Sequence, residues 1–193
     1  MTIYLVRHGR AEAGVEHPDP GLDEIGRSQA ERAAEALKKL GTARLICSPL
    51  RRARETAAPI AAALGLTPEI RDEVAEVFDP SMAIGARRDM LIPLLSGRWS
   101  EQSEPLRRWR DRVLAALVAL GSEKAIVVSH FVAISAAIGA STDDDRVSPC
   151  ALANASITTM EVVNGKLDLR RPGEVSHLSR DEITASHAMI GQR

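Results

Sequence analysis

Three short apolar runs, each followed at once by polar residues, constrain the fold of this chain most. The runs are Thr2–Val6, Arg44–Cys47 and Ala125–Ser129, and their length and apolar content predict buried strands. Between and after them, apolar residues at helical spacing predict helices at 26–40, 50–64, 106–120 and 131–140. Alternation of strands with helices favours an α/β fold in which most strands are parallel.

The C-terminal part of the sequence predicts a hairpin. Residues 157–163 and 166–169 have strand character and flank Asn164-Gly165, a dipeptide typical of tight hairpin turns. We therefore predict a three-layer α/β/α sandwich whose mostly parallel sheet has an antiparallel edge strand. The 193 residues suit a single domain over 1–193. Within it, residues 71–103 are the least regular part, because prolines and glycines interrupt short helical pieces.

Composition excludes several classes of partner. The formal charge of −1 and the aromatic content of 3% argue against binding to nucleic acid or to an acidic membrane surface. No run approaches the roughly 20 apolar residues that span a bilayer. The N-terminus begins directly with strand residues and has no leader-like pattern, and Cys47 and Cys150 do not form a CxxC pair. These features predict a cytoplasmic protein with reduced thiols; the sequence does not fix the oligomeric state and leaves a homodimer open.

Three polar clusters follow the predicted strands directly. They are Arg7-His8-Gly9, the segment 48–52 and Ser129-His130. Ligands of open α/β sheets bind beyond the carboxyl ends of the strands, so these clusters are expected to meet at one end of the sheet. The arginines among them match a phosphate dianion, because the guanidinium is a planar fork of donors that stays charged.

The histidines in these clusters suit covalent phosphate chemistry. A neutral imidazole is a competent nucleophile near neutral pH, since its unperturbed pKa is about 6.5. His8 follows its strand immediately and is therefore held firmly, and we expect Gly9 to leave room for the substrate phosphorus. A helix that opens at Phe131 would direct its N–H groups and the positive end of its dipole at an anion beside His130.

These motifs together resemble the histidine phosphatase superfamily, which includes cofactor-dependent phosphoglycerate mutases and many small phosphatases. The resemblance runs nearly from end to end of the chain. It covers Leu5-Val6-Arg7-His8-Gly9, the stretches 22–30 and 48–57, Val127-Val128-Ser129-His130, and Asn154-Ala155-Ser156-Ile157-Thr158.

The resemblance implies roles for four residues. His8, in Arg-His-Gly, resembles the nucleophile that carries the phosphoryl group, and Arg7 resembles a phosphate clamp. Arg52 matches the arginine of the Ser-x-Leu-x-Arg-Ala pattern and so resembles the second clamp. His130 is similar to the second histidine, which binds the phosphate and stabilises the charged transition state.

The resemblance also implies a general acid after the third strand, where the family has a Leu-x-Glu context. Val74-Ala75-Glu76 fits this context best, which makes Glu76 the candidate, and Glu73 is the alternative. Relatives place lid-like segments in this region, so we expect one at about 71–103. Arg10, beside the phosphate motif, is a candidate substrate contact. For Arg87, Arg88 and Arg98, contact with the substrate and a solvated surface remain equal alternatives.

The sequence thus predicts a phosphomonoesterase for small phosphorylated metabolites, working through phosphohistidine on His8 without a cofactor. No metal-binding spacing occurs, and Asp143-Asp144-Asp145 is interpreted as a solvated loop. Three alternatives stay open: a phosphoglycerate-type mutase, a protein phosphohistidine phosphatase and a non-catalytic phosphate-binding module. The substrate itself is not fixed by the sequence.

Overall fold

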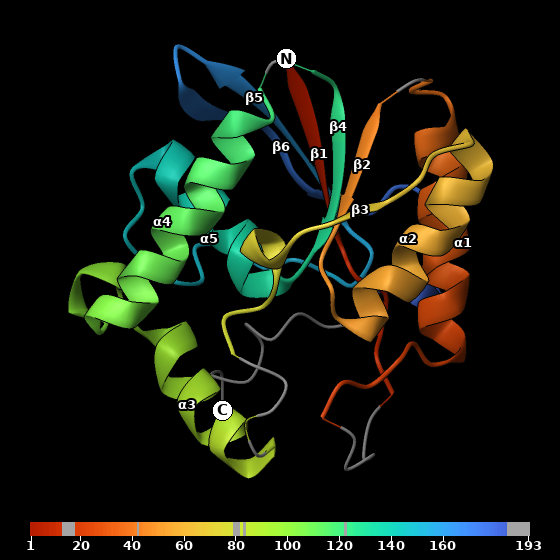
Figure 1. Cartoon of the computed structure of the whole chain (residues 1–193). Helices are drawn as coiled ribbons and strands as arrows, with labels where there is room; N and C mark the ends of the chain where they lie inside the picture. Colours follow the sequence, from red (N-terminus) through yellow and green to blue (C-terminus); the bar gives the residue numbers. More distant parts are fainter. Residues whose placement is uncertain (13–17, 42, 79–81, 83, 122, 185–193) are drawn as a thin grey trace.

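Six strands form one sheet in the order β3-β2-β4-β1-β5-β6, with helices on both faces. This computed structural model describes residues 1–12, 18–41, 43–78, 82, 84–121 and 123–184 (Figure 1). The elements are β1 (Thr2–Arg7), α1 (Glu24–Lys38), β2 (Arg44–Cys47), α2 (Arg51–Leu64), β3 (Glu69–Ile70), the 3₁₀ turn η1 (Asp72–Val74), α3 (Ile84–Ser96), η2 (Trp99–Glu101), α4 (Glu104–Ala119), β4 (Ala125–Ser129), α5 (Phe131–Thr142), β5 (Ile157–Val163), β6 (Lys166–Glu174) and η3 (Arg180–Glu182).

The pairing of the strands confirms the predicted mostly parallel sheet. β4 lies between β1 and β2 and is parallel to both, and β3 is parallel to β2. The antiparallel pairings gather at the other edge, where β5 joins β1 and β6 joins β5. The Asn164-Gly165 hairpin supplies this edge as predicted, and both turn residues have positive φ.

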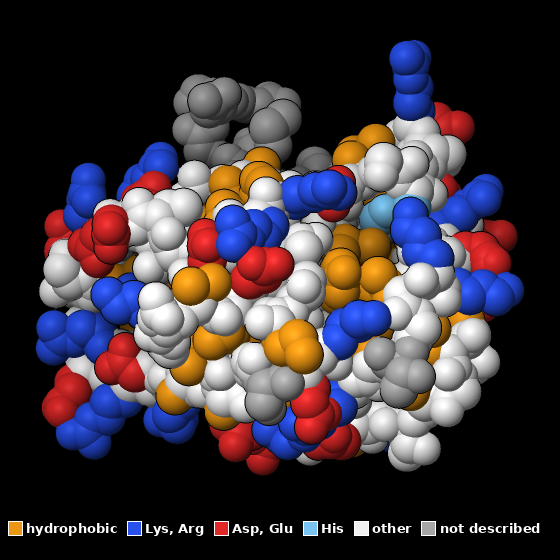
Figure 2. Space-filling model, turned by 90° about the horizontal axis from the view of Figure 1, so that it is seen from above, with side chains coloured by type: hydrophobic (Ala, Val, Ile, Leu, Met, Phe, Trp, Pro, Cys, Tyr) orange, Lys and Arg blue, Asp and Glu red, His pale blue; other side chains and the backbone are white. Residues whose placement is uncertain are grey.

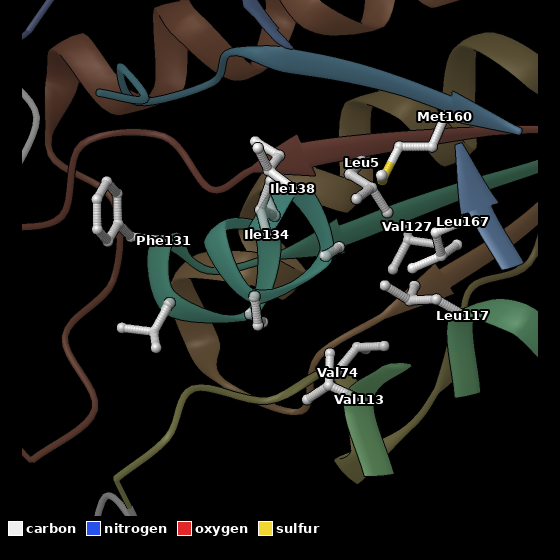
Figure 3. Close-up of a cluster of buried hydrophobic side chains, with 14 of the residues drawn as sticks. Leu5, Val74, Val113, Leu117, Val127, Phe131, Ile134, Ile138, Met160 and Leu167 are labelled. Carbon is white, nitrogen blue, oxygen red and sulfur yellow. The ribbon is translucent and has the colours of Figure 1, made fainter. Parts of the chain in front are cut away.

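Two hydrophobic cores explain why the central strand β4 is apolar over residues 125–128. Along β4, Ala125 and Val127 belong to the core under α4 and α5, while Ile126 and Val128 belong to the core under α1 and α2. Successive side chains of a strand point to opposite faces, so a strand covered on both sides has no polar position. Figure 3 shows the first core, in which Leu117 of α4 lies close to the sheet.

The helices end where the local sequence dictates. The side chain of Asp23 accepts a hydrogen bond from the Gly26 amide, so α1 begins at Glu24, two residues before the predicted start. At the C-terminal end of α2, Gly65 takes the left-handed conformation that glycine adopts without strain. The strand β3 has only two residues, Glu69–Ile70.

The segment 71–103 is more regular than the sequence predicts. Instead of short interrupted pieces, α3 runs from Ile84 to Ser96 and contains Pro93. A proline inside a helix costs about 3 kcal/mol because it removes one hydrogen bond and clashes with the preceding turn. Leu94 is buried and Leu91 packs beside it against the core, and this burial offsets the cost.

Charges of both signs are mixed on one face of the molecule (Figure 2). On the face seen in Figure 2, Lys and Arg side chains alternate with Asp and Glu, so no large area of one sign is present there. None of the helices in the described ranges is long and apolar enough to cross a membrane. The cytoplasmic location and the absence of a nucleic-acid partner stay predictions.

The packing predicts that truncation of a buried and of an exposed apolar side chain will have very different effects on the free energy of unfolding. Leu117→Ala should lower the free energy of unfolding by about 2–5 kcal/mol, because Leu117 is 2% exposed and its removal leaves a cavity. Ile70→Ala on β3 is the control: Ile70 is 50% exposed, so the change should stay within about 0.5 kcal/mol. Urea unfolding measures both, and equal effects would contradict the described core.

Candidate active site

The three polar clusters meet at one end of the sheet, as predicted. The His8 amide donates to the carbonyl of Ser129 at 3.0 Å, and the Ser48 amide donates to the carbonyl of Val128 at 3.0 Å. These bonds continue the parallel pairing just beyond the ends of β1 and β2. The rings of His8 and His130 consequently lie 5.0 Å apart between centroids, tilted by 55°.

Hydrogen bonds fix the tautomer of His8. Its Nδ1 lies 2.7 Å from the carbonyl oxygen of Gly9, and because a carbonyl only accepts, Nδ1 carries the proton. The lone pair of the neutral ring is therefore on Nε2. The Arg52 Nε–H lies 3.2 Å from this nitrogen and donates to it. The nucleophilic atom of the imidazole thus faces a guanidinium, which is where a phosphate group would be bound.

Gly9 is required by packing against α1, and the room that it was expected to leave for a substrate phosphorus stays a prediction. A Cβ atom on Gly9 would come within 2.5 Å of the Gly26 carbonyl oxygen. On the other side, the Gly9 amide donates to the Thr56 hydroxyl at 3.0 Å, which in turn donates to the Arg52 carbonyl at 2.7 Å. Thr56 therefore connects the loop of His8 to the helix that carries Arg52.

Arg7 is a buried cation. Only 1% of it is exposed, its NH1 group donates to the carbonyl of Leu152, and its guanidinium lies 5.3 Å from the centre of the Phe131 ring. Burial lowers the pKa of Arg7 to about 10, against the opposing effect of the Glu76 carboxylate. The guanidinium is still protonated at neutral pH, so a fixed positive charge stands at the end of β1.

His130 is buried completely and caps the N-terminal end of α5. Burial holds the pKa of His130 well below its usual value, and the charges of Arg52, His8 and Arg7 lower it further. The ring is therefore neutral. Its Nε2 lies 2.7 Å from the Ser48 hydroxyl, which accepts from the Leu50 amide and so has its own hydrogen free for this contact. With Ser48 as the donor of this bond, the ring proton is on Nδ1, a buried atom with no hydrogen-bond partner among the described residues.

Glu76 reaches the same site from the segment after β3. The Ser129 hydroxyl donates to the carbonyl of Val74 at 2.7 Å and thereby holds this segment against the end of β4. The Glu76 carboxyl lies within hydrogen-bonding reach of the Val132 amide at the start of α5. Burial raises the pKa of Glu76, although the nearby arginines oppose the shift. Glu73, in contrast, is exposed, and the geometry therefore favours Glu76 as the acid.

Beside Glu76 lies a cavity of about 490 Å³. Its wall is largely apolar, with Leu50, Phe78 and Trp109 among the lining residues. Besides Glu76, the acidic side chains of Asp19 and Asp72 and the basic side chain of Arg112 line it. A leaving group bound here would be next to the carboxyl of Glu76.

Of the other charged candidates, the structure describes the side chains of Arg10 and Arg98. The Arg10 guanidinium is 2.5 Å from the Asp23 carboxylate, so at least one edge of it is occupied by the cap of α1. Arg98 is exposed and pairs through its backbone with Arg146, beyond the C-terminal end of α5, whereas His130 lies at the N-terminal end. The side chains of Arg87 and Arg88 lie outside the described part of the chain. The contact of Arg10 with a substrate stays a prediction.

Two carboxylates of the acidic run 143–145 contact protein side chains. Asp144 pairs with Arg146 at 2.5 Å, and Asp145 accepts from the Ser100 hydroxyl at 2.5 Å. No group of three metal-binding side chains occurs in the part of the chain that the structure describes.

Sequence reasoning missed the residues that hold this site in place. Ser48, Thr56, Ser129 and Asn154 lie within the quoted motifs, but hydroxyls and amides carry no chemistry of their own that would single them out. Asn154 donates from its side chain to the His8 carbonyl at 3.2 Å, across 146 positions of sequence. Only the three-dimensional structure brings such partners together.

Comparison with known proteins identifies the family. Residues 3–174 match the model of the histidine phosphatase superfamily (branch 1). The bifunctional protein Rv2228c of Mycobacterium tuberculosis is 31% identical over 153 residues, which cover 66% of this chain; the chain spans only about 40% of the length of that relative. The probable phosphatase C1687.21 of Schizosaccharomyces pombe is 26% identical over 94% of this chain and 97% of its own length.

The fold agrees with this match. The solved structure of YhfR from Bacillus stearothermophilus superposes with a TM-score of 0.75 at 24% sequence identity, covering 92% of this chain and 99% of the other. At that identity the likeness concerns the fold, whereas the family follows from the match over 3–174. The chain belongs to branch 1 of the histidine phosphatase superfamily.

Proposed function

We propose that this protein hydrolyses small phosphomonoesters through a phosphohistidine on Nε2 of His8. The family and its phosphatase-named members support a phosphatase activity. The observation that carries the finer proposal is the tautomer of His8: Nδ1 is protonated by its bond to Gly9, and the Nε2 lone pair faces Arg52. The residue roles predicted from the sequence are retained on this basis.

Phosphoryl transfer depends mainly on positioning and on fixed positive charge. Arg7 and Arg52 would hold the non-bridging oxygens of the phosphate, and the Nδ1–H of His130 would donate to another oxygen. The amide groups at the start of α5 add the positive end of a helix dipole, so the predicted contribution of Phe131 comes from its backbone. Its ring meanwhile supports the Arg7 guanidinium from one side.

In the first step the Nε2 lone pair of His8 attacks phosphorus in line with the ester oxygen. The phosphorus–oxygen bond breaks, its electron pair goes to the leaving oxygen, and the proton of the Glu76 carboxyl neutralises that oxygen. Burial raises the pKa of Glu76 and thus keeps a larger fraction protonated for this task.

In the second step the Glu76 carboxylate takes a proton from water, and the oxygen of that water attacks phosphorus. The bond from phosphorus to Nε2 breaks, and its electron pair returns to the imidazole. Inorganic phosphate leaves, and His8 and Glu76 are back in their starting states. The cycle needs no metal ion, because the two arginines supply the positive charge.

The cavity beside Glu76 supports hydrolysis of a metabolite, since its volume of about 490 Å³ suits a small-molecule leaving group. A phosphohistidine phosphatase of this fold usually lacks such an acid, and a non-catalytic module would have no need of it. A mutase is the remaining alternative. The mutases that this chain resembles carry a Trp-Asn pair after Arg-His-Gly, where this chain has Arg10-Ala11-Glu12.

Substitution of the nucleophile tests the covalent step. His8→Ala should abolish turnover while inorganic phosphate still binds, because Arg7 and Arg52 remain. Acid-quenched wild-type protein incubated with a labelled phosphomonoester should carry the label on Nε2 of His8, which phosphohistidine-specific NMR distinguishes from Nδ1. Turnover near the wild-type rate in His8→Ala would refute the mechanism.

Substitution of the acid tests proton donation. Glu76→Gln should slow alkyl phosphates by about 10²–10⁴-fold and aryl phosphates by less than tenfold, since phenolate leaves without a proton. Because the pKa of Glu76 is raised, its acid form persists above the pH at which a free glutamate ionises. The value of kcat/KM for alkyl phosphates should therefore fall as the pH rises through the raised pKa of Glu76. Glu73→Gln is the matched control and should leave both the rate and this alkaline decline unchanged; a larger loss there would reassign the acid.

A single assay separates the phosphatase from the mutase. The protein is given 3-phosphoglycerate with a catalytic amount of 2,3-bisphosphoglycerate in the presence of EDTA, and 2-phosphoglycerate and free phosphate are followed together. We expect phosphate release to exceed isomerisation, at a rate that EDTA does not change. Isomerisation faster than release would assign the mutase activity instead.

A further inference from the structure

Behind the nucleophile, hydrogen bonds connect the C-terminal segment 175–184 with the loop of His8. The link begins at Gln29 of α1, whose side chain is fully buried. Its Oε1 accepts from the Arg10 amide at 2.7 Å, and its Nε2 donates to the Glu182 carbonyl at 2.5 Å and to the Thr184 hydroxyl at 3.2 Å. The orientation of the amide is fixed, because Arg10 can only donate and the Glu182 carbonyl can only accept.

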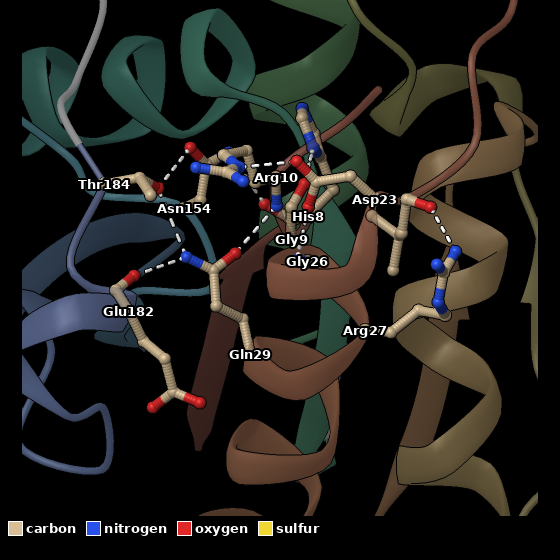
Figure 4. A network of polar contacts seen from close by, with 11 residues as sticks. His8, Gly9, Arg10, Asp23, Gly26, Arg27, Gln29, Asn154, Glu182 and Thr184 are labelled. Carbon is tan, nitrogen blue, oxygen red and sulfur yellow. Dashed lines mark hydrogen bonds and ion pairs between the residues drawn. The ribbon is translucent and has the colours of Figure 1, made fainter. Parts of the chain in front are cut away.

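The link returns to the nucleophile through Thr184. Its hydroxyl, which accepts from Gln29, donates to the Asn154 Oδ1 at 2.9 Å. The other end of the Asn154 amide donates to the carbonyl of His8 at 3.2 Å. A closed ring of contacts therefore runs from residue 8 through residue 10, Gln29, Thr184 and Asn154 back to residue 8 (Figure 4).

A second set of contacts anchors the segment 175–184 to α1. Glu182 is 8% exposed, and its carboxylate accepts from the Ser28 hydroxyl at 2.5 Å and from the Ser179 amide at 2.8 Å. The bond from Ser28 contributes most to lowering the pKa of Glu182 to about 2, so the anchor is charged at any working pH. Ser28 and Gln29 are neighbours on α1, so the contacts of Glu182 with Ser28 and those of Gln29 with the segment 175–184 hold this segment against the same part of α1.

The segment that closes this ring lies beyond residues 3–174, the stretch that matches the family. We propose that the segment 175–184 is a positioning element of this phosphatase, in which Thr184 acts through Gln29 and Asn154 to hold the two peptide groups that flank Gly9, directly after His8. Thr184 does not touch the reacting atoms. The proposal rests on the proposed function only in assigning His8 as the nucleophile.

The effect of breaking the ring follows from its geometry. Without the Thr184 hydroxyl, an N–H of Gln29 and the Oδ1 of Asn154 lose their partner, and the peptide of His8 can shift. Arg7 and Arg52 are not members of the ring, so phosphate binding should not change. One lost hydrogen bond corresponds to about a five- to tenfold loss in kcat, with KM unchanged.

The experiment compares four variants of the whole chain. Thr184→Val keeps the shape of the side chain but loses the hydroxyl, Thr184→Ala removes both, and Thr184→Ser keeps the hydroxyl. Ile183→Ala is the control, because Ile183 is exposed and makes no contact in the ring of hydrogen bonds described above. For each, we would measure kcat and KM on an aryl phosphate, vanadate affinity, thermal unfolding, and the ¹⁵N signals of the His8 ring. Thr184→Ala replaces Thr184→Val if the latter does not fold.

We expect a five- to tenfold lower kcat and altered His8 ring signals in Thr184→Val, vanadate affinity within twofold, and wild-type behaviour in Thr184→Ser and Ile183→Ala. Unchanged kcat and ring signals in folded Thr184→Val would overturn the proposal. An equal loss of kcat in Ile183→Ala would also overturn it, and so would a loss of kcat in Thr184→Val that is explained by unfolding at the assay temperature. If the wild-type protein turns over no phosphomonoester, the proposed function fails. The ¹⁵N signals of the His8 imidazole still decide in that case whether Thr184 positions His8.

Discussion

The parallel pairing of β1 with β4 is the constraint on which the site depends. It places Arg7 opposite Ser129, and the next backbone bond, from His8 to the Ser129 carbonyl, brings the two histidine rings to a centroid distance of 5.0 Å. Both strands are buried on both faces, so a shift of one residue would move every side chain to the wrong core. The distance between the two histidines is therefore set by the hydrophobic pattern of strands that take no part in the chemistry.

The site concentrates charge where water is scarce. Arg7 is buried, Arg52 is mostly so, and His130 is held neutral between them. Such an arrangement costs stability in the free protein, because buried cations lose solvation. A phosphate dianion would compensate both arginines at once, and the donors need not reorganise when charge moves during the reaction. The half-buried carboxyl of Glu76 completes the balance, since it can carry or release one proton.

The regular elements could be predicted because their signals are local. The period of apolar residues indicated the strands and the helices α1, α2, α4 and α5 within a few positions, and the position of His8 directly after a strand followed from the sequence. The helix through Pro93 could not be predicted, because the burial of Leu94 that stabilises it is a tertiary effect. The choice between Glu76 and Glu73 depended on burial for the same reason. Gln29 and Thr184 act across more than 150 positions, and no local pattern indicates such a contact.

The two edges of the sheet bear on how the protein behaves at high concentration. An exposed edge offers unpaired amides and carbonyls to the edge of another molecule, and this is a common route to aggregation. Here β3 ends the sheet after only two residues. At the opposite edge β6 carries Lys166, Arg170 and Arg171 and contains Pro172, which cannot donate a backbone hydrogen bond. Both edges are thus poor templates for a further strand, which protects the protein from polymerising through its own sheet.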